Sequence, residues 1–142
     1  MVEKLKEKLW AFIVHNNPDV MLNLQKDYSV THYLDEKVNG ILPMVDKLLA
    51  EDKPNYIIEE LALNELTADL KPSKFLYIRS VLEEEFPDDF KRLSELGVLT
   101  SEVVNLIAAC MDDFEAFDFS EETYDDRHLR YAVITRVHDH LL

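Results

Sequence analysis

Residues 101–111 read Ser-Glu-Val-Val-Asn-Leu-Ile-Ala-Ala-Cys-Met, and only Asn105 interrupts the apolar run that follows the first two residues. Thr100 or Ser101 places a hydroxyl before this run, where it suits a helix N-cap. A helix that is apolar on all sides is normally buried on all sides. We therefore expect an all-α bundle with this helix at its centre.

Glycine is scarce in the chain, since Gly40 and Gly97 are the only two among 142 residues. A sheet protein of this length needs more residues that adopt positive φ at its turns. Glycine-rich phosphate loops and glycine-hinged catalytic turns also need several glycines close together. The composition therefore favours a single all-helical domain over residues 1–142 and excludes most familiar classes of nucleotide-binding enzyme.

Apolar residues recur at helical spacing along the whole chain and predict about seven helices. The first helix is expected over residues 2–14. The last is expected over residues 124–141 and starts from a capping box formed by Thr123 and Asp126. Pro43 either starts a new helix or kinks a long one, and the sequence leaves both arrangements open.

Acidic residues outnumber basic ones by 29 to 15, which gives a net charge of −14. Residues 51–142 hold 22 acidic and 9 basic residues, so this part of the chain carries −13 of that charge. DNA, RNA and anionic membranes repel such a chain, whereas basic proteins attract it. We expect a basic protein partner, with neither direct nucleic-acid binding nor membrane binding. The oligomeric state stays open.

Cys110 is the only cysteine, so we expect neither an internal disulfide nor a cysteine-based metal site. Within so apolar a helix it is expected to be a buried, unreactive core residue. No segment is apolar enough to span a membrane, and the N-terminus alternates charges instead of forming a signal-peptide core. These features favour a cytoplasmic setting.

The familiar catalytic and metal-binding patterns are incomplete. His138 and His140 point about 200° apart on a helix and cannot share a metal from one face. Asp125 and His128 share a helix face, but no second acid–histidine pair completes a di-iron set. The acidic stretch 112–126 lacks the central glycine of a calcium-binding loop. We therefore predict no catalytic, cofactor-binding or metal-binding residue, and an enzymatic role is the less favoured interpretation.

Acidic residues concentrate in the second half of the chain. Residues 110–126 hold eight acids and no lysine or arginine, and residues 112–123 are expected to form a loop that three phenylalanines pin to the core. Residues 83–85 place three glutamates at a helix C-terminus, where they oppose the helix dipole. The candidate acidic interaction surface comprises Glu83, Glu84, Glu85, Asp88, Asp89, Asp112, Asp113, Glu115, Glu121 and Glu122.

Several short motifs occur together in a fixed order: Asn17-Pro18-Asp19, Leu63-Asn64-Glu65-Leu66, Ser73-Lys74-Phe75, Val81-Leu82 with Glu85-Phe86, Phe117-Asp118-Phe119, Tyr124-Asp125 and Leu129-Arg130-Tyr131. Their order resembles a domain-of-unknown-function family of small acidic helical proteins from Bacteroidetes-type bacteria, often encoded near mobile elements. The resemblance covers most of the chain and implies an all-helical fold with no established activity. The chain departs from the family pattern at Thr67-Ala68-Asp69, where a glycine is expected. No functional residue is carried over.

Charge and the incomplete catalytic patterns favour a non-enzymatic acidic protein-interaction or accessory module. The alternative is an acidic mimic of nucleic acid that inhibits a DNA-binding enzyme, with its carboxylates standing in for phosphates. A second alternative is a metal-binding or enzymatic helical protein built around Asp125, His128 and the C-terminal histidines.

Overall fold

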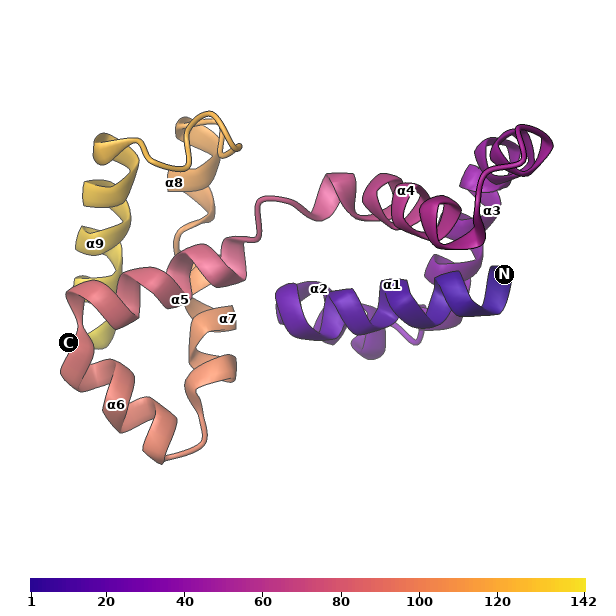
Figure 1. The fold of residues 1–142 in the computed structure, drawn as a ribbon. Coiled ribbons are helices and arrows are strands. Elements are labelled where there is room, and N and C mark those ends of the chain that lie inside the picture. The colour runs from indigo at the N-terminus through magenta and orange to yellow at the C-terminus, as the bar shows by residue number, and fades with distance from the viewer. The chain divides into compact units, whose positions relative to one another are not determined.

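The computed structural model describes all 142 residues and contains no strand, so the prediction of an all-α fold is confirmed. Nine α-helices and one 3-10 helix follow one another, rather than the predicted seven (Figure 1). Their bounds are α1 Val2–Asn16, α2 Pro18–Lys26, α3 Val30–Ala50, α4 Asn55–Thr67, η1 Ala68–Leu70, α5 Lys74–Glu85, α6 Pro87–Glu95, α7 Leu99–Ala109, α8 Met111–Ala116 and α9 Arg127–Leu141.

The chain divides into two compact units, unit 1 over Met1–Leu70 and unit 2 over Lys71–Leu142. Each unit has its own buried apolar cluster, and α7 contributes only to the cluster of unit 2. The structure therefore does not contain the single core, centred on the 101–111 helix, that the sequence predicted. That residues 1–142 behave as a single domain stays a prediction.

In unit 1, α1 packs against both α3 and α4. Its stripe of Leu5, Leu9 and Ile13 is completely buried, as the i, i+4 spacing requires for one helix face. On the polar side of α1, the Nζ atoms of Lys4 and Lys8 lie 3.0 and 2.9 Å from the Glu59 carboxylate of α4. The hydrogen bonds from Lys8 and Lys4 lower the pKa of Glu59.

Helix α3 runs without a break through both Gly40 and Pro43. Pro43 removes one backbone hydrogen bond from the helix. Val38 and Val45, on either side of it, are 0% and 3% exposed in the core of unit 1. Burial on both sides of the proline favours one long helix over two short ones.

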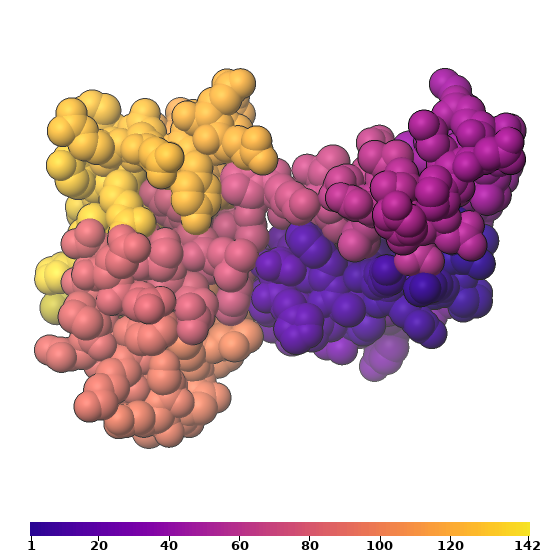
Figure 2. All heavy atoms as spheres, in the orientation of Figure 1, coloured from indigo at the N-terminus to yellow at the C-terminus, as the bar shows by residue number.

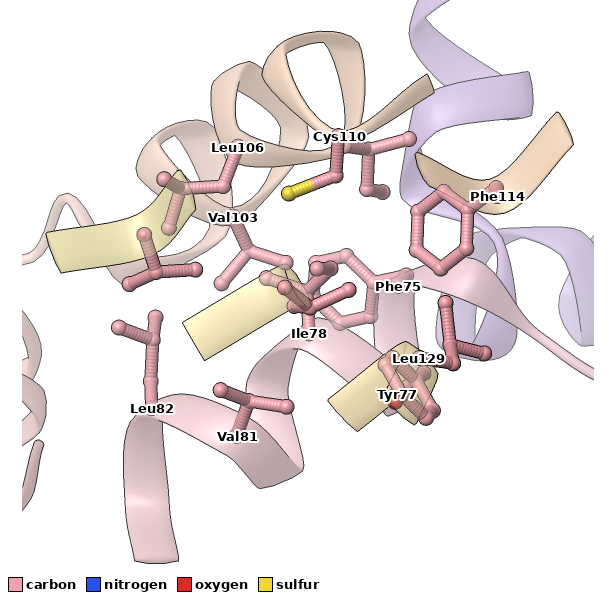
Figure 3. Packing of buried hydrophobic residues seen from close by; sticks show 13 residues of the cluster. Phe75, Tyr77, Ile78, Val81, Leu82, Val103, Leu106, Cys110, Phe114 and Leu129 are labelled. Atoms are coloured by element: carbon pink, nitrogen blue, oxygen red, sulfur yellow. The ribbon is translucent and has the colours of Figure 1, made fainter. Parts of the chain in front are cut away.

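In unit 2, α5, α7 and α9 contact one another and enclose the core. Val103 and Leu106 of α7, together with Cys110 directly after the helix, lie across from Ile78 of α5 (Figure 3). The expectation that α7 is buried on all sides is wrong, because Asn105 and Ala108 are exposed. The helices around α7 cover only part of its circumference.

The start of α9 also differs from the expectation. The helix begins at Arg127, and its N-cap is Asp126, whose Oδ1 accepts hydrogen bonds from the backbone N–H groups of His128 (2.7 Å) and Leu129 (3.2 Å). The prediction that Thr123 and Asp126 form a capping box is therefore wrong. Aspartate is itself among the strongest N-cap residues, so it starts the helix three residues later than predicted.

The two separate cores predict that a cavity in one unit destabilises mainly that unit. Leu9→Ala in unit 1 and Leu106→Ala in unit 2 should each lower the free energy of unfolding by about 2–5 kcal/mol, because each leaves a cavity among buried side chains. Native-state hydrogen exchange should quicken in the mutated unit. Leu49→Ala, at a side chain that is 46% exposed, is the matched control and should cost about 0.5 kcal/mol or less. Equal quickening in both units would show one cooperative domain instead.

Candidate acidic interaction surface

The acidic segment, residues 112–126, follows the turn at Cys110 and joins α7 to α9 (Figure 1). Its first residues belong to the short helix α8, and turns make up the rest. The expectation of a loop over residues 112–123 is therefore wrong for residues 112–116, which are helical. All eight carboxylates of the segment come from within 15 consecutive residues, so their mutual repulsion has to be offset by other contacts.

Aromatic packing supplies those contacts. The ring of buried Tyr77 on α5 lies edge-on to Phe114, Phe119 and Tyr124, with centroid distances of 5.8, 5.3 and 5.2 Å. Phe117 is partly buried against the hydrophobic core of unit 2. Edge-to-face pairs of this kind stabilise by about 0.5–1.5 kcal/mol each beyond their burial. The predicted anchoring of the segment by its three phenylalanines is confirmed.

Hydrogen bonds within the segment order the turn before α9. The hydroxyl of Thr123 accepts a hydrogen bond from the backbone N–H of Ser120 at 2.8 Å and donates one to the carbonyl of Asp118 at 3.1 Å. Asp118 itself adopts a φ of 49°, a left-handed conformation that aspartate tolerates better than most residues. The turn is thus held by side-chain contacts as well as by aromatic burial.

Most carboxylates of the segment point to solvent. Asp113 pairs with Arg136 of α9 at 3.2 Å, and Asp126 caps α9. The other six are exposed and form no ion pair: Asp112, Glu115, Asp118, Glu121, Glu122 and Asp125. The segment lies on the surface of unit 2, where Figure 2 draws it in orange to yellow.

The C-terminal end of α5 brings three further candidate acids close to basic side chains. Arg79 lies 3.4 Å from Glu83, and Arg130 of α9 lies 2.5 Å from Glu84 and 3.7 Å from Glu85. These arginines compensate the unfavourable position of three acids at a helix C-terminus. The guanidinium of Arg130 also sits 6.0 Å from the centroid of the Tyr77 ring.

A pocket of about 270 Å³ opens where the end of α5 meets the start of α9. We call it the α5–α9 pocket, and its lining consists of Glu84, Glu85, Tyr124, Asp125, Asp126, Arg127 and Arg130. Four carboxylates and two arginines leave it with a net charge of −2. No pattern in the sequence indicates that Glu84 and Glu85 line the same pocket as Asp125 and Asp126.

The remaining candidates, Asp88 and Asp89, lie in the first turn of α6, where Asp89 pairs with Arg92 at 3.2 Å. Figures 1 and 2 draw α6 and α8 well apart within unit 2. The ten predicted acids therefore do not form one patch. Asp118, Asp125 and Asp126 belong with the acidic segment but were not among the ten, although the charge count over residues 110–126 included them.

Asp125, His128 and the C-terminal histidines, considered above as metal ligands, do not form a common site. Asp125 precedes α9 and lies outside the helix, so the helical spacing assumed between Asp125 and His128 does not apply. His140 instead lies 3.0 Å from Glu102 on α7. No group of three or more histidine, cysteine, aspartate or glutamate side chains is arranged to hold a metal ion.

Two buried groups in unit 2 hold their protons tightly. Burial raises the pKa of the Cys110 thiol to about 12 and that of the Tyr77 hydroxyl to about 12. Cys110 is completely buried, as the sequence predicted. The Tyr77 hydroxyl is buried without a hydrogen-bond partner.

Comparisons with family models, with curated proteins and with solved structures found no match to this chain. The resemblance to a bacterial family of acidic helical proteins therefore stays a prediction. None of the helices combines the length and the apolar character needed to cross a bilayer.

The raised pKa values predict a loss of stability in alkali. The thiol and the phenol ordinarily titrate near 9.0 and 10.0, so the unfolded chain loses these protons at a lower pH than the folded chain does. Their contribution to the free energy of unfolding is complete below pH 9 and declines as the pH rises toward 12. Urea denaturation between pH 8 and 11 measures this decline.

The double variant Cys110→Ala/Tyr77→Phe should show a shallower decline than the wild-type chain. Tyr28→Phe, at a side chain that is 97% exposed, is the control and should leave the slope unchanged. An unaltered slope in the double variant would contradict the assignment of the alkaline loss to these two groups.

Proposed function

We propose that this protein is a non-enzymatic interaction module that binds a basic segment of a partner protein through the acidic segment and the adjoining α5–α9 pocket. The observation that carries the proposal is the set of six exposed carboxylates without ion pairs, held on an ordered backbone by aromatic side chains. Unit 2 as a whole holds 16 acidic and 8 basic residues, a net charge of −8.

Order in the acidic segment matters for binding. A disordered acidic tail loses conformational entropy when it meets a partner, whereas a segment already fixed by the Tyr77 cluster loses much less. Fixed carboxylates also impose a spacing on the partner's lysines and arginines, which gives selectivity as well as attraction. The α5–α9 pocket adds a recess in which one basic side chain of the partner meets Asp125.

The ion pairs within unit 2 bear on the alternative of nucleic-acid mimicry. A mimic needs rows of free carboxylates to replace phosphates, but arginines neutralise Glu83, Glu84 and Asp89. This arrangement supports a local binding surface better than an extended phosphate-like track. The proposal keeps the cytoplasmic setting favoured by the lone, buried Cys110.

The triple variant Glu115→Gln/Glu121→Gln/Glu122→Gln tests the proposal, since all three side chains are exposed and unpaired. Proteins captured from a lysate at low and moderate salt are identified, and the affinity of a purified basic partner is then measured for each variant. Loss of three charge contacts should weaken binding about tenfold or more, and raised salt should weaken the wild-type complex in the same way.

The matched control is Glu60→Gln/Glu65→Gln/Glu95→Gln, which changes the net charge equally at exposed positions outside the surface. It should bind nearly as well as the wild-type chain. Equal weakening in both triple variants would reduce the proposal to diffuse attraction by net charge. A captured DNA-binding enzyme that loses DNA when this protein is added would favour the mimic instead.

A further inference from the structure

A second pocket, of about 290 Å³, lies between α1 and α3 and belongs entirely to unit 1. We call it the α1–α3 pocket, and its lining consists of Glu3, Lys6, Glu7 and Trp10 from α1 and Thr31, Leu34 and Asp35 from α3. The spacing of these positions places them on one face of each helix. The pocket shares no residue with the acidic segment or the α5–α9 pocket.

The apolar part of this pocket is formed by Trp10 and Leu34, which are partly buried against the core of unit 1. Trp10 is the only tryptophan in the chain. Among aromatic side chains, tryptophan attracts a cation to its ring face most strongly. A cationic group that carries an apolar stem, such as an arginine side chain, matches both the ring and the neighbouring leucine.

The polar rim of the pocket is acidic. Lys6 lies 2.6 Å from Asp35 and 3.4 Å from Glu3, and the hydrogen bond that Lys6 donates to Asp35 raises the pKa of Lys6. Lys6 therefore forms an ion pair that links α1 to α3. Glu7 is exposed and has no ion pair. Three carboxylates against one lysine leave the rim with a net charge of −2.

The acidic rim of the α1–α3 pocket favours a positively charged occupant. A second copy of the chain would bring a net charge of −14, and nucleic acids or anionic membranes would also be repelled. The volume of about 290 Å³ lies just below the range for small-molecule sites, about 300–1,000 Å³, and suits one long side chain. We propose that the α1–α3 pocket receives an arginine side chain from a basic segment of a partner protein, with the guanidinium against Trp10 and its charge matched by Glu7.

This inference is independent of the function proposed for unit 2, because it is argued from unit 1 alone. The probe is a fluorescein-labelled peptide of alternating arginine and leucine, read by fluorescence anisotropy. The same peptide with citrulline in place of every arginine is neutral and nearly identical in shape. Saturable binding of the arginine peptide, with a change in Trp10 fluorescence, is expected, and the citrulline peptide should not bind.

Substitutions in the pocket give effects of opposite sign. Trp10→Ala should weaken binding about tenfold, and Trp10→Phe, which preserves more of the packing, by less. Glu7→Gln should weaken it about two- to fivefold, whereas Lys6→Gln, which frees Asp35 and Glu3, should strengthen it by a similar factor. Glu60→Gln, on α4 and outside the pocket, is the charge-matched control. Circular dichroism confirms that each variant remains helical.

Several results would overturn the proposal. Weaker binding by Lys6→Gln would mean that this lysine acts only as a helix clamp. A loss with Glu60→Gln equal to the loss with Glu7→Gln would indicate attraction by net charge alone. Free arginine amide that binds as tightly as the peptide would replace the protein segment with a small organic cation. The Glu115/Glu121/Glu122 triple variant should leave the Trp10 and Lys6 effects intact, so failure here is distinguishable from failure of the function proposed for unit 2.

Discussion

The edge-to-face contacts of Tyr77 with Phe114, Phe119 and Tyr124 connect the core of unit 2 to its acidic segment. Without this cluster, eight carboxylates in 15 residues would favour an extended, mobile chain, since like charges repel and little else restrains them. Burial of four aromatic rings fixes the backbone and leaves the carboxylates outside. The most charged part of the protein is therefore held by its most apolar contacts.

Arginine placement decides which of the acids are available to a partner. Arg79, Arg92, Arg130 and Arg136 each reach a candidate carboxylate, and Arg130 joins α9 to the end of α5. The acids at the end of α5 and at the start of α6 are thereby largely compensated within unit 2. In the acidic segment only Asp113 is compensated in this way, by Arg136. Net charge alone does not distinguish these groups, although their capacity to attract a basic partner differs.

In unit 1 the lysines act mainly as cross-links between helices. Lys4 and Lys8 join α1 to α4, Lys6 joins α1 to α3, and Lys37 joins α3 to Asp69 of η1. Their charges are used within the unit, so the rim of the α1–α3 pocket remains acidic. Each unit thus presents carboxylates beside aromatic side chains. The ion pairs that neutralise its other acids are formed mainly by lysines in unit 1 and by arginines in unit 2.

The sequence by itself determined the helical fold, the acidic character and the burial of Cys110, because glycine content, apolar spacing and charge are local properties of the chain. It also indicated the anchoring role of Phe114 and its neighbours. Only the tertiary structure decided that α3 continues through Pro43 and that the buried residues form two cores. It also placed Glu84 beside Arg130, 46 residues away. Such features depend on contacts between distant residues, and no local pattern of spacing or propensity specifies which of those contacts form.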